Sequence, residues 1–190
     1  QAEDGIRDVE RSRGLGDVYK RQVYKVGDDA VYPSHGLVKI VAIEKKLIGD
    51  QELNFLILQV VESDITVMIP EGSVQARGLR PIAKKNELKN LWSLIKGKTK
   101  YRTEENLSWN KRYRNYTEKL KSGNIIMAGE VFREINDISK KKELSFGEQK
   151  ILETAFNRIV KELSASLKQK EDDIYVDIKK LLIKPDSINI

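Results

Sequence analysis

Residues 36–69 read GLVKIVAIEKKLIGDQELNFLILQVVESDITVMI. The segment contains three runs rich in β-branched and aliphatic residues, at 37–43, 53–61 and 65–69. Residues 48–51 (IGDQ) have the composition of a hairpin connection, and residues 62–64 form a second turn. With a further short strand at Val31-Tyr32, ended by Pro33, the pattern predicts four or five antiparallel strands in a small curled sheet or barrel.

After Pro81 the apolar residues recur with helical spacing. Ser145 and Glu148 are three residues apart and form a capping box before a long apolar stripe. Trp92 lies on the stripe of the first helix and is predicted to be a core residue. We expect helices near residues 88–95, 108–121, 128–135, 145–167 and 173–182.

The two patterns define an α+β chain in which a small antiparallel β module precedes an all-helical domain. We place the β module at residues 23–79 and the helical domain at 80–190. Residues 1–22 contain few apolar residues and no sustained helix or strand period. They resemble translated vector sequence, so we expect a non-native or disordered leader.

Composition excludes several classes of protein. The 190 residues include no cysteine and one histidine, His35, which rules out disulfides, thiolate sites and multi-histidine metal sites. No apolar run approaches the roughly 18 residues of a membrane span, and neither common phosphate-loop motif occurs. We therefore expect a cytoplasmic protein, not attached to membrane, with no cofactor, no metal and no catalytic residue.

The net charge of +6 is distributed unevenly along the chain. Residues 80–121 carry thirteen basic and four acidic side chains, whereas residues 23–79 carry five and eight. A concentrated basic segment beside a slightly acidic module favours an anionic partner, most often nucleic acid. A solvated lysine-rich face is the alternative.

Trp109 stands at the start of the second expected helix, in the segment SWNKRYRNY. Its spacing from Tyr113, Tyr116 and Leu120 is that of one helix face, which favours a core tryptophan. The alternative is a ring that projects beyond the helix N-terminus and inserts into nucleic acid, and the periodicity alone favours it less. The basic residues suited to phosphate contacts are Lys111, Arg112, Arg114 and Lys119.

Five blocks, in order, carry a resemblance to a known family. They are VYKVGDDAVYPSHGLVKIVAIE, FLILQV with DITVMIP, SWNKRYRNYTEKLKSGN, AGEVFREI and LSFGEQKILETAFNRIVKEL. Together they resemble the CarD/CdnL family of bacterial transcription regulators over residues 23–182. The V-Y-P-x-H-G block alone also occurs in transcription-repair coupling factors.

The resemblance implies a Tudor-like (SH3-like) module that docks on the β subunit of RNA polymerase. It also implies that the helical domain binds promoter DNA at the upstream edge of the bubble with limited sequence specificity. Trp109 would be the wedge residue, with Lys111, Arg112, Arg114 and Lys119 beside it.

The polymerase-facing residues implied by the resemblance are Lys45, Lys46, Thr66 and Met68. Relatives carry a basic residue where this chain has Met68, so the charge complement of that contact differs. The expected function is that of a monomeric, non-enzymatic transcription regulator. The alternative is a protein-interaction adaptor whose helices make no direct DNA contact.

Overall fold

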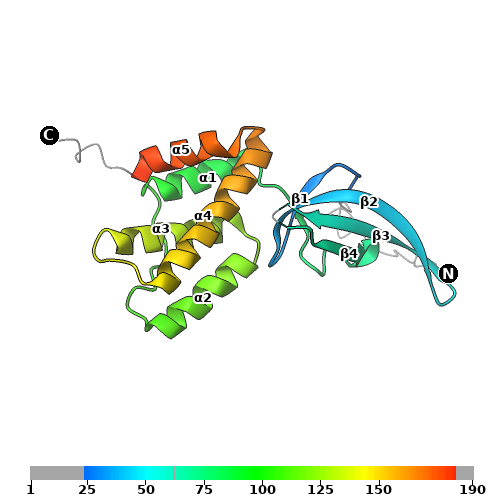
Figure 1. Ribbon diagram of the computed structural model, residues 1–190, viewed down its shortest axis with the longest axis horizontal. Coiled ribbons are helices and arrows are strands. Elements are labelled where there is room, and N and C mark those ends of the chain that lie inside the picture. Colours follow the sequence, from blue (N-terminus) through cyan, green and yellow to red (C-terminus); the bar gives the residue numbers. More distant parts are fainter. Residues whose placement is uncertain (1–23, 62, 183–190) are drawn as a thin grey trace, which may run out of the picture.

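The computed structural model describes residues 24–61 and 63–182. An antiparallel sheet occupies one end of the long axis, and a bundle of helices occupies the other (Figure 1). This arrangement confirms the α+β class with the sheet first. The expected leader, residues 1–22, lies outside the described residues.

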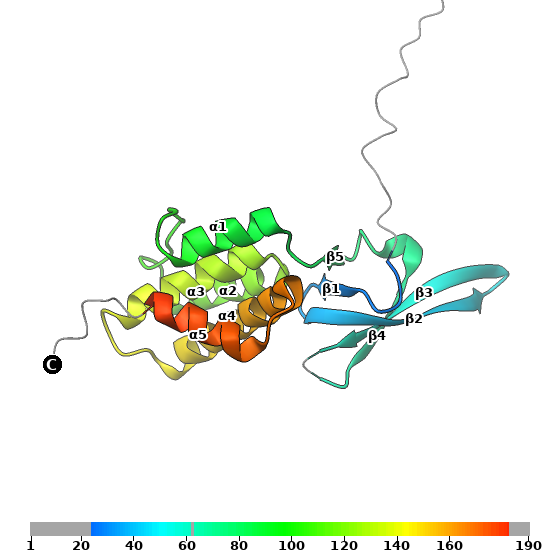
Figure 2. The ribbon, with the colours of Figure 1, turned by 90° about the horizontal axis from the view of Figure 1, so that it is seen from above.

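The sheet has five strands in the order β4-β3-β2-β1-β5. They are β1 (Asp29–Tyr32), β2 (Gly36–Ile48), β3 (Gln51–Val60), β4 (Thr66–Pro70) and β5 (Arg80–Pro81). β2 and β3 stay paired as far as Ile48 and Gln51, so this hairpin is longer than the sequence pattern predicted. Gly49 closes it with a φ of 61°, a left-handed conformation that glycine adopts without a Cβ clash. In Figure 2 the hairpin projects away from the helices.

Alternation along the strands sends Ile40, Leu56, Leu58 and Ile69 to one face, where they form the core of the β module. Phe55 and Ile57 alternate with them, and they are also buried. Residues 55–58 of β3, which lies between β2 and β4, are buried on both faces, and they form a continuous apolar run.

The fifth strand, Arg80–Pro81, lies at the start of the expected helical domain. Val31 pairs with Arg80, and Ala30 pairs with Pro81. Pro81 is compatible with this position because β5 is an edge strand, where a missing N–H leaves no gap inside the ladder. The sheet therefore extends past residue 79, and the chain leaves it only after Pro81.

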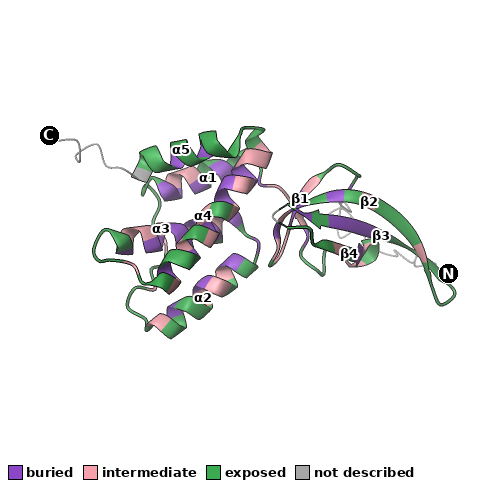
Figure 3. Ribbon diagram, viewed as in Figure 1, coloured by how far each residue is buried: buried purple, intermediate pink, exposed green. Residues whose placement is uncertain are grey.

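Five helices follow and share one hydrophobic core. They are α1 (Lys85–Ile95), α2 (Trp109–Lys121), α3 (Ile125–Ser139), α4 (Phe146–Leu167) and α5 (Glu171–Leu182). The capping box that begins α4 is confirmed, since Ser145 and Glu148 bond each other's backbone N–H groups. Trp92 is partly buried and packs against this core. Figure 3 shows buried residues on the helix faces that turn toward one another.

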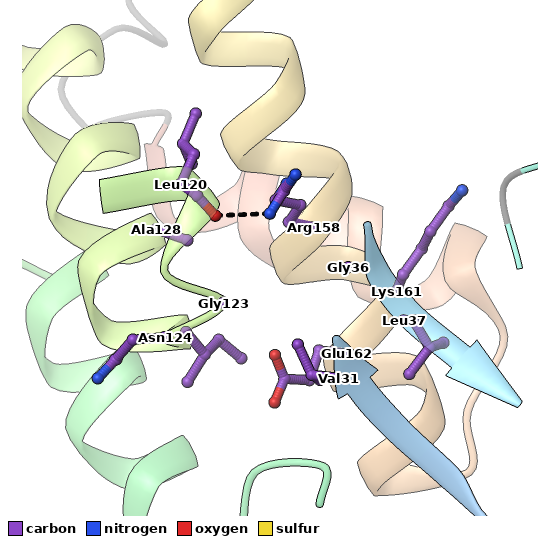
Figure 4. A pocket seen from close by; sticks show the side chains of 11 residues that line it. Val31, Gly36, Leu37, Leu120, Gly123, Asn124, Ala128, Arg158, Lys161 and Glu162 are labelled. Carbon is purple, nitrogen blue, oxygen red and sulfur yellow. Dashed lines mark hydrogen bonds between the residues drawn. The ribbon is translucent and has the colours of Figure 1, made fainter. Parts of the chain in front are cut away.

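The sheet and the helices are joined by hydrogen-bonded contacts. Arg80 on β5 binds Glu162 on α4, with Nη1 and Oε1 2.6 Å apart, and its Nε donates to the Gly123 carbonyl at 2.8 Å. Arg158 on α4 donates to the carbonyl of Leu120 at 2.6 Å (Figure 4). It also donates to the carbonyl of Ser34 at 2.8 Å. These contacts fix α2 and α4 relative to the sheet.

Candidate nucleic-acid interface

Trp109 is the first residue of α2, and it lies against the first turn of α4. A Cβ on Gly147 would come within 2.7 Å of Trp109 Cζ2, so the ring packs directly on that glycine. The Tyr113 ring lies 5.5 Å away, and the Arg112 guanidinium carbon lies 5.5 Å from the indole centroid. The ring is partly buried, and it is not a member of the helical core cluster.

The face of α2 that enters the core differs from the one that the spacing favoured. Tyr116 and Leu120 are buried together with Arg112, at spacings of four residues, whereas Tyr113 is 48% exposed. The helix is thus rotated so that Trp109 and Tyr113 flank the core side instead of forming it. Trp109 is therefore neither a fully buried core residue nor a fully exposed ring.

Arg112 is buried, and its Nη2 lies 3.1 Å from Oε1 of Glu148. Glu148 also accepts from Lys142 Nζ at 3.1 Å and from Ser145. Burial by itself would raise the pKa of Glu148, but the Ser145 backbone N–H, Lys142 and Arg112 outweigh it and lower the pKa to about 2. Arg112 therefore links α2 to the start of α4 beneath the Trp109 ring.

Lys119 also has internal partners. Its Nζ lies 3.1 Å from Glu104 and 3.3 Å from Glu130, and only 19% of its side chain is exposed. Burial alone would lower the pKa of Lys119, but the two carboxylates raise it above its usual value. Lys119 thereby ties the segment before α2 to α3.

Lys111 and Arg114 are the exposed members of the predicted basic set. Arg114 pairs with Glu118 at 3.2 Å, but both side chains are largely in solvent, where such pairs are weak. Lys111 has no ion pair within the described part of the chain. These two side chains can reach a ligand in solution.

Phe146 is a feature that the sequence analysis missed. It is the first residue of α4, next to Gly147, and it is 82% exposed. The sequence does indicate this exposure. Phe146 directly follows the capping residue Ser145, and it does not share a helix face with the apolar stripe that begins at Ile151. Trp109, Tyr113 and Phe146 thus place three aromatic rings near the paired beginnings of α2 and α4.

The four polymerase-facing candidates lie on β2 and on the edge strand β4. Cross-strand register puts Lys46, Thr66 and Met68 on one face of the sheet. Lys45 points to the opposite face, where its Nζ lies 3.3 Å from Glu52. Met68 is 43% exposed beside the buried Ile57.

Over residues 24–61 and 63–182, no cluster of three or more His, Cys, Asp or Glu side chains is arranged to hold a metal ion. In the same part of the chain, no helix has the length and apolar character needed to cross a bilayer.

The fold and the candidate interface together define a class of protein in which a small antiparallel β module is followed by a helical domain with a basic, aromatic-bearing surface. The family model of the CarD-like/TRCF RID domain matches residues 24–83, and that of the CarD C-terminal domain matches residues 92–179. The chain belongs to the CarD family of transcription regulators.

Two relatives illustrate the match. "Putative transcription factor YdeB" of Bacillus subtilis (strain 168) is 31% identical over 141 residues, which cover 74% of this chain and 90% of that protein. The solution NMR structure of the 72-residue N-terminal domain of Myxococcus xanthus CarD is 40% identical and covers 30% of this chain and 76% of that one, with a TM-score of 0.27.

Proposed function

We propose that this CarD-family regulator binds the β subunit of RNA polymerase through its sheet and stabilises the open promoter complex through α2. In this proposal the protein acts in the cytoplasm as a monomer and performs no catalysis. The observation that carries the proposal is the position of Trp109, which sits at the exposed beginning of a helix and is supported by Arg112, Tyr113 and Gly147.

A tryptophan in this position suits a wedge. When the duplex melts at the upstream edge of the bubble, one base pair loses a stacking neighbour, at a cost of about a few kcal/mol. A planar indole can replace that neighbour and recover part of the loss. The contacts to Gly147 and Arg112 hold the ring in place before DNA arrives, so little conformational entropy is lost on binding.

The basic residues of α2 divide into two roles in this proposal. Lys111 and Arg114 are exposed on the side of α2 turned away from Trp109 and would contact DNA phosphates there. Arg112 and Lys119 are largely buried in ion pairs, so they would position α2 instead. Phosphate contacts of this kind carry little sequence information, which fits an interface of limited specificity.

The sheet offers an edge for the polymerase. β4 is an edge strand, and its unpaired backbone groups can pair with a strand of the β subunit. Thr66 and Met68 on β4 and Lys46 on β2 share one face of the sheet and would add side-chain contacts, and Lys45 would act from the opposite face. Tethering to polymerase would supply a high local concentration, so a weak DNA contact suffices.

The decisive experiment compares Trp109→Ala with Tyr175→Ala, which removes a 40% exposed aromatic side chain from α5. We expect Trp109→Ala to shorten the lifetime of the open complex severalfold and Tyr175→Ala to leave it unchanged. Capture of RNA polymerase by both variants should equal that of the wild type. Normal capture with an unchanged lifetime for Trp109→Ala would favour the adaptor function instead.

A further inference from the structure

A groove runs between α2 and α4 beside the proposed wedge. The two helices lie parallel, because Trp109 contacts Gly147 at their beginnings and the Leu120 carbonyl accepts from Arg158 Nη1 near the end of α2. Tyr113 and Thr117 line one wall, and Phe146, Lys150 and Thr154 line the other.

The aromatic residues of this groove are unusually exposed. Phe146 is 82% exposed and Tyr113 is 48% exposed, although each has a large apolar surface that favours burial. Neither ring belongs to the helical core cluster. A ligand with flat faces could cover both rings without any rearrangement of the core.

The charge of the groove is of one sign. Lys121, Lys150 and Arg158 line it, and none of the described residues that line it is Asp or Glu. Arg158 already donates to two carbonyls, so the charge open to a ligand comes mainly from the exposed Lys121 and Lys150. The groove is therefore complementary to an anionic chain.

We propose that the groove between α2 and α4 binds a short stretch of unpaired nucleic-acid strand, with one base stacked on Phe146 and phosphates near Lys150 and Lys121. This inference rests on the proposed function, since the strand would be the one released beside the Trp109 wedge. Aromatic rings interleaved with lysines are the usual surface for single strands, because every base has a face that can stack.

The dimensions agree with this occupant. Phe146 and Thr154 are eight residues apart on α4, which is about 12 Å along the helix axis. A stacked strand advances about 3.4 Å per nucleotide, so the wall accommodates about three nucleotides. A paired base, whose faces are covered by its neighbours, could not stack on Phe146.

The test measures affinity of the full chain for two fluorescently labelled DNAs, a duplex and the same duplex with a central bubble of mismatched bases. We expect the wild type to prefer the bubble and Phe146→Ala to lose about tenfold in bubble affinity, within the range for one stacked base. Duplex affinity should not change. Phe146→Tyr should keep the preference, because the stacking face remains.

Two control variants match the changes. Leu47→Ala removes a 74% exposed apolar side chain at the β2–β3 hairpin, and it should leave both affinities unchanged. Lys150→Gln should weaken bubble binding and reduce its salt dependence, whereas Lys89→Gln, an exposed lysine on α1, should not.

Equal affinity of the wild type for bubble and duplex, or of Phe146→Ala and the wild type for the bubble, would overturn the inference. Weaker capture of RNA polymerase by Phe146→Ala at unchanged bubble affinity would also overturn it, because the groove would then bind protein. Trp109→Ala in the open-complex assay tests the proposed function separately, since Phe146 is not part of the wedge.

Discussion

Trp109 is supported on one side by Gly147 and on another by Arg112, and part of its surface remains in solvent. Truncation of a fully buried tryptophan to alanine lowers the unfolding free energy of a protein by about 3 to 5 kcal/mol. We expect Trp109→Ala to lower the unfolding free energy by less, about 1 to 2 kcal/mol, because only part of the Trp109 ring is packed against the protein. Chemical denaturation of the variant and the wild type would measure the difference.

Trp92 provides the internal comparison for that measurement, since it packs against the helical core. Trp92→Ala should destabilise the protein by more than Trp109→Ala does. A loss of about 4 kcal/mol for Trp109→Ala would make it a core residue. Any effect on promoter opening would then follow from unfolding.

Glu148 gives a pH-dependent contribution to stability. Its pKa in the folded protein is lowered to about 2, so the contribution is present above the usual glutamate range and is lost as the pH falls toward 2. At neutral pH we expect Glu148→Gln to cost about 2 to 3 kcal/mol. The difference from the wild type should shrink steadily below about pH 4.5, which thermal unfolding at a series of pH values would show.

Glu118→Gln is the matched control for the pH series. Glu118 pairs with Arg114, but its side chain is 65% exposed, and a solvated pair contributes little. The unfolding free energy of Glu118→Gln should equal that of the wild type at every pH. A constant offset between Glu148→Gln and the wild type, with no dependence on pH, would contradict the role assigned to the Glu148 carboxylate.

At the scale of elements, the beginning of α4 forms the support for the Trp109 ring. Ser145 and Glu148 fix the first turn, and Gly147 in that turn leaves the space in which the Trp109 ring lies. The sequence predicted the capping box from spacing alone, because a cap is a local interaction. It could not predict that the glycine would meet a tryptophan from another helix.

Gly147→Ala tests that support. The new Cβ would lie 2.7 Å from Trp109 Cζ2, so the ring must move outward. Alanine also favours the helix by up to about 1 kcal/mol, which offsets part of the strain, so net stability should change by less than about 1 kcal/mol. In a Trp92→Phe background, the fluorescence of Trp109 should report a more solvated ring.

A spectrum unchanged by Gly147→Ala would show that Trp109 does not rest on α4. Gly72→Ala is a suitable control, because nothing lies within 4 Å of a Cβ at that position. The fluorescence and the unfolding free energy of Gly72→Ala should be close to those of the wild type. Together the two variants separate contact with the ring from a general effect of adding a methyl group.

At the scale of the molecule, the order of strands and helices was predictable, whereas the contacts between them were not. Periods of two and of 3.6 residues are local and identified the elements. Arg80 and Glu162 are 82 residues apart, and nothing local marks them as partners. For the same reason, the spacing in α2 suggested an aromatic core face, although burial of Arg112 depends on Glu148 in another helix.

The Arg80–Glu162 ion pair is where the β module and the helices meet. Oε1 of Glu162 also accepts from the Ala83 N–H at 2.9 Å, and the Glu162 side chain is only 6% exposed. We expect this junction to set the orientation of the five-stranded sheet relative to the helical domain. Docking of the sheet on polymerase would then place Trp109 at a fixed point on the DNA.

Arg80→Met should destabilise the folded protein by about 2 to 3 kcal/mol, below the full value for a buried pair because the Arg80 side chain is 27% exposed. The uncompensated charge on Glu162 causes most of that loss, so the double variant Arg80→Met, Glu162→Leu should recover part of it. Calorimetry should show that the sheet and the helices unfold separately in Arg80→Met. Arg77 is an exposed residue shortly before β5, and the control variant Arg77→Met should unfold like the wild type. If Arg80→Met unfolded like Arg77→Met, the junction would not couple the two parts, and the position of Trp109 on DNA would have to be set by the DNA contact itself.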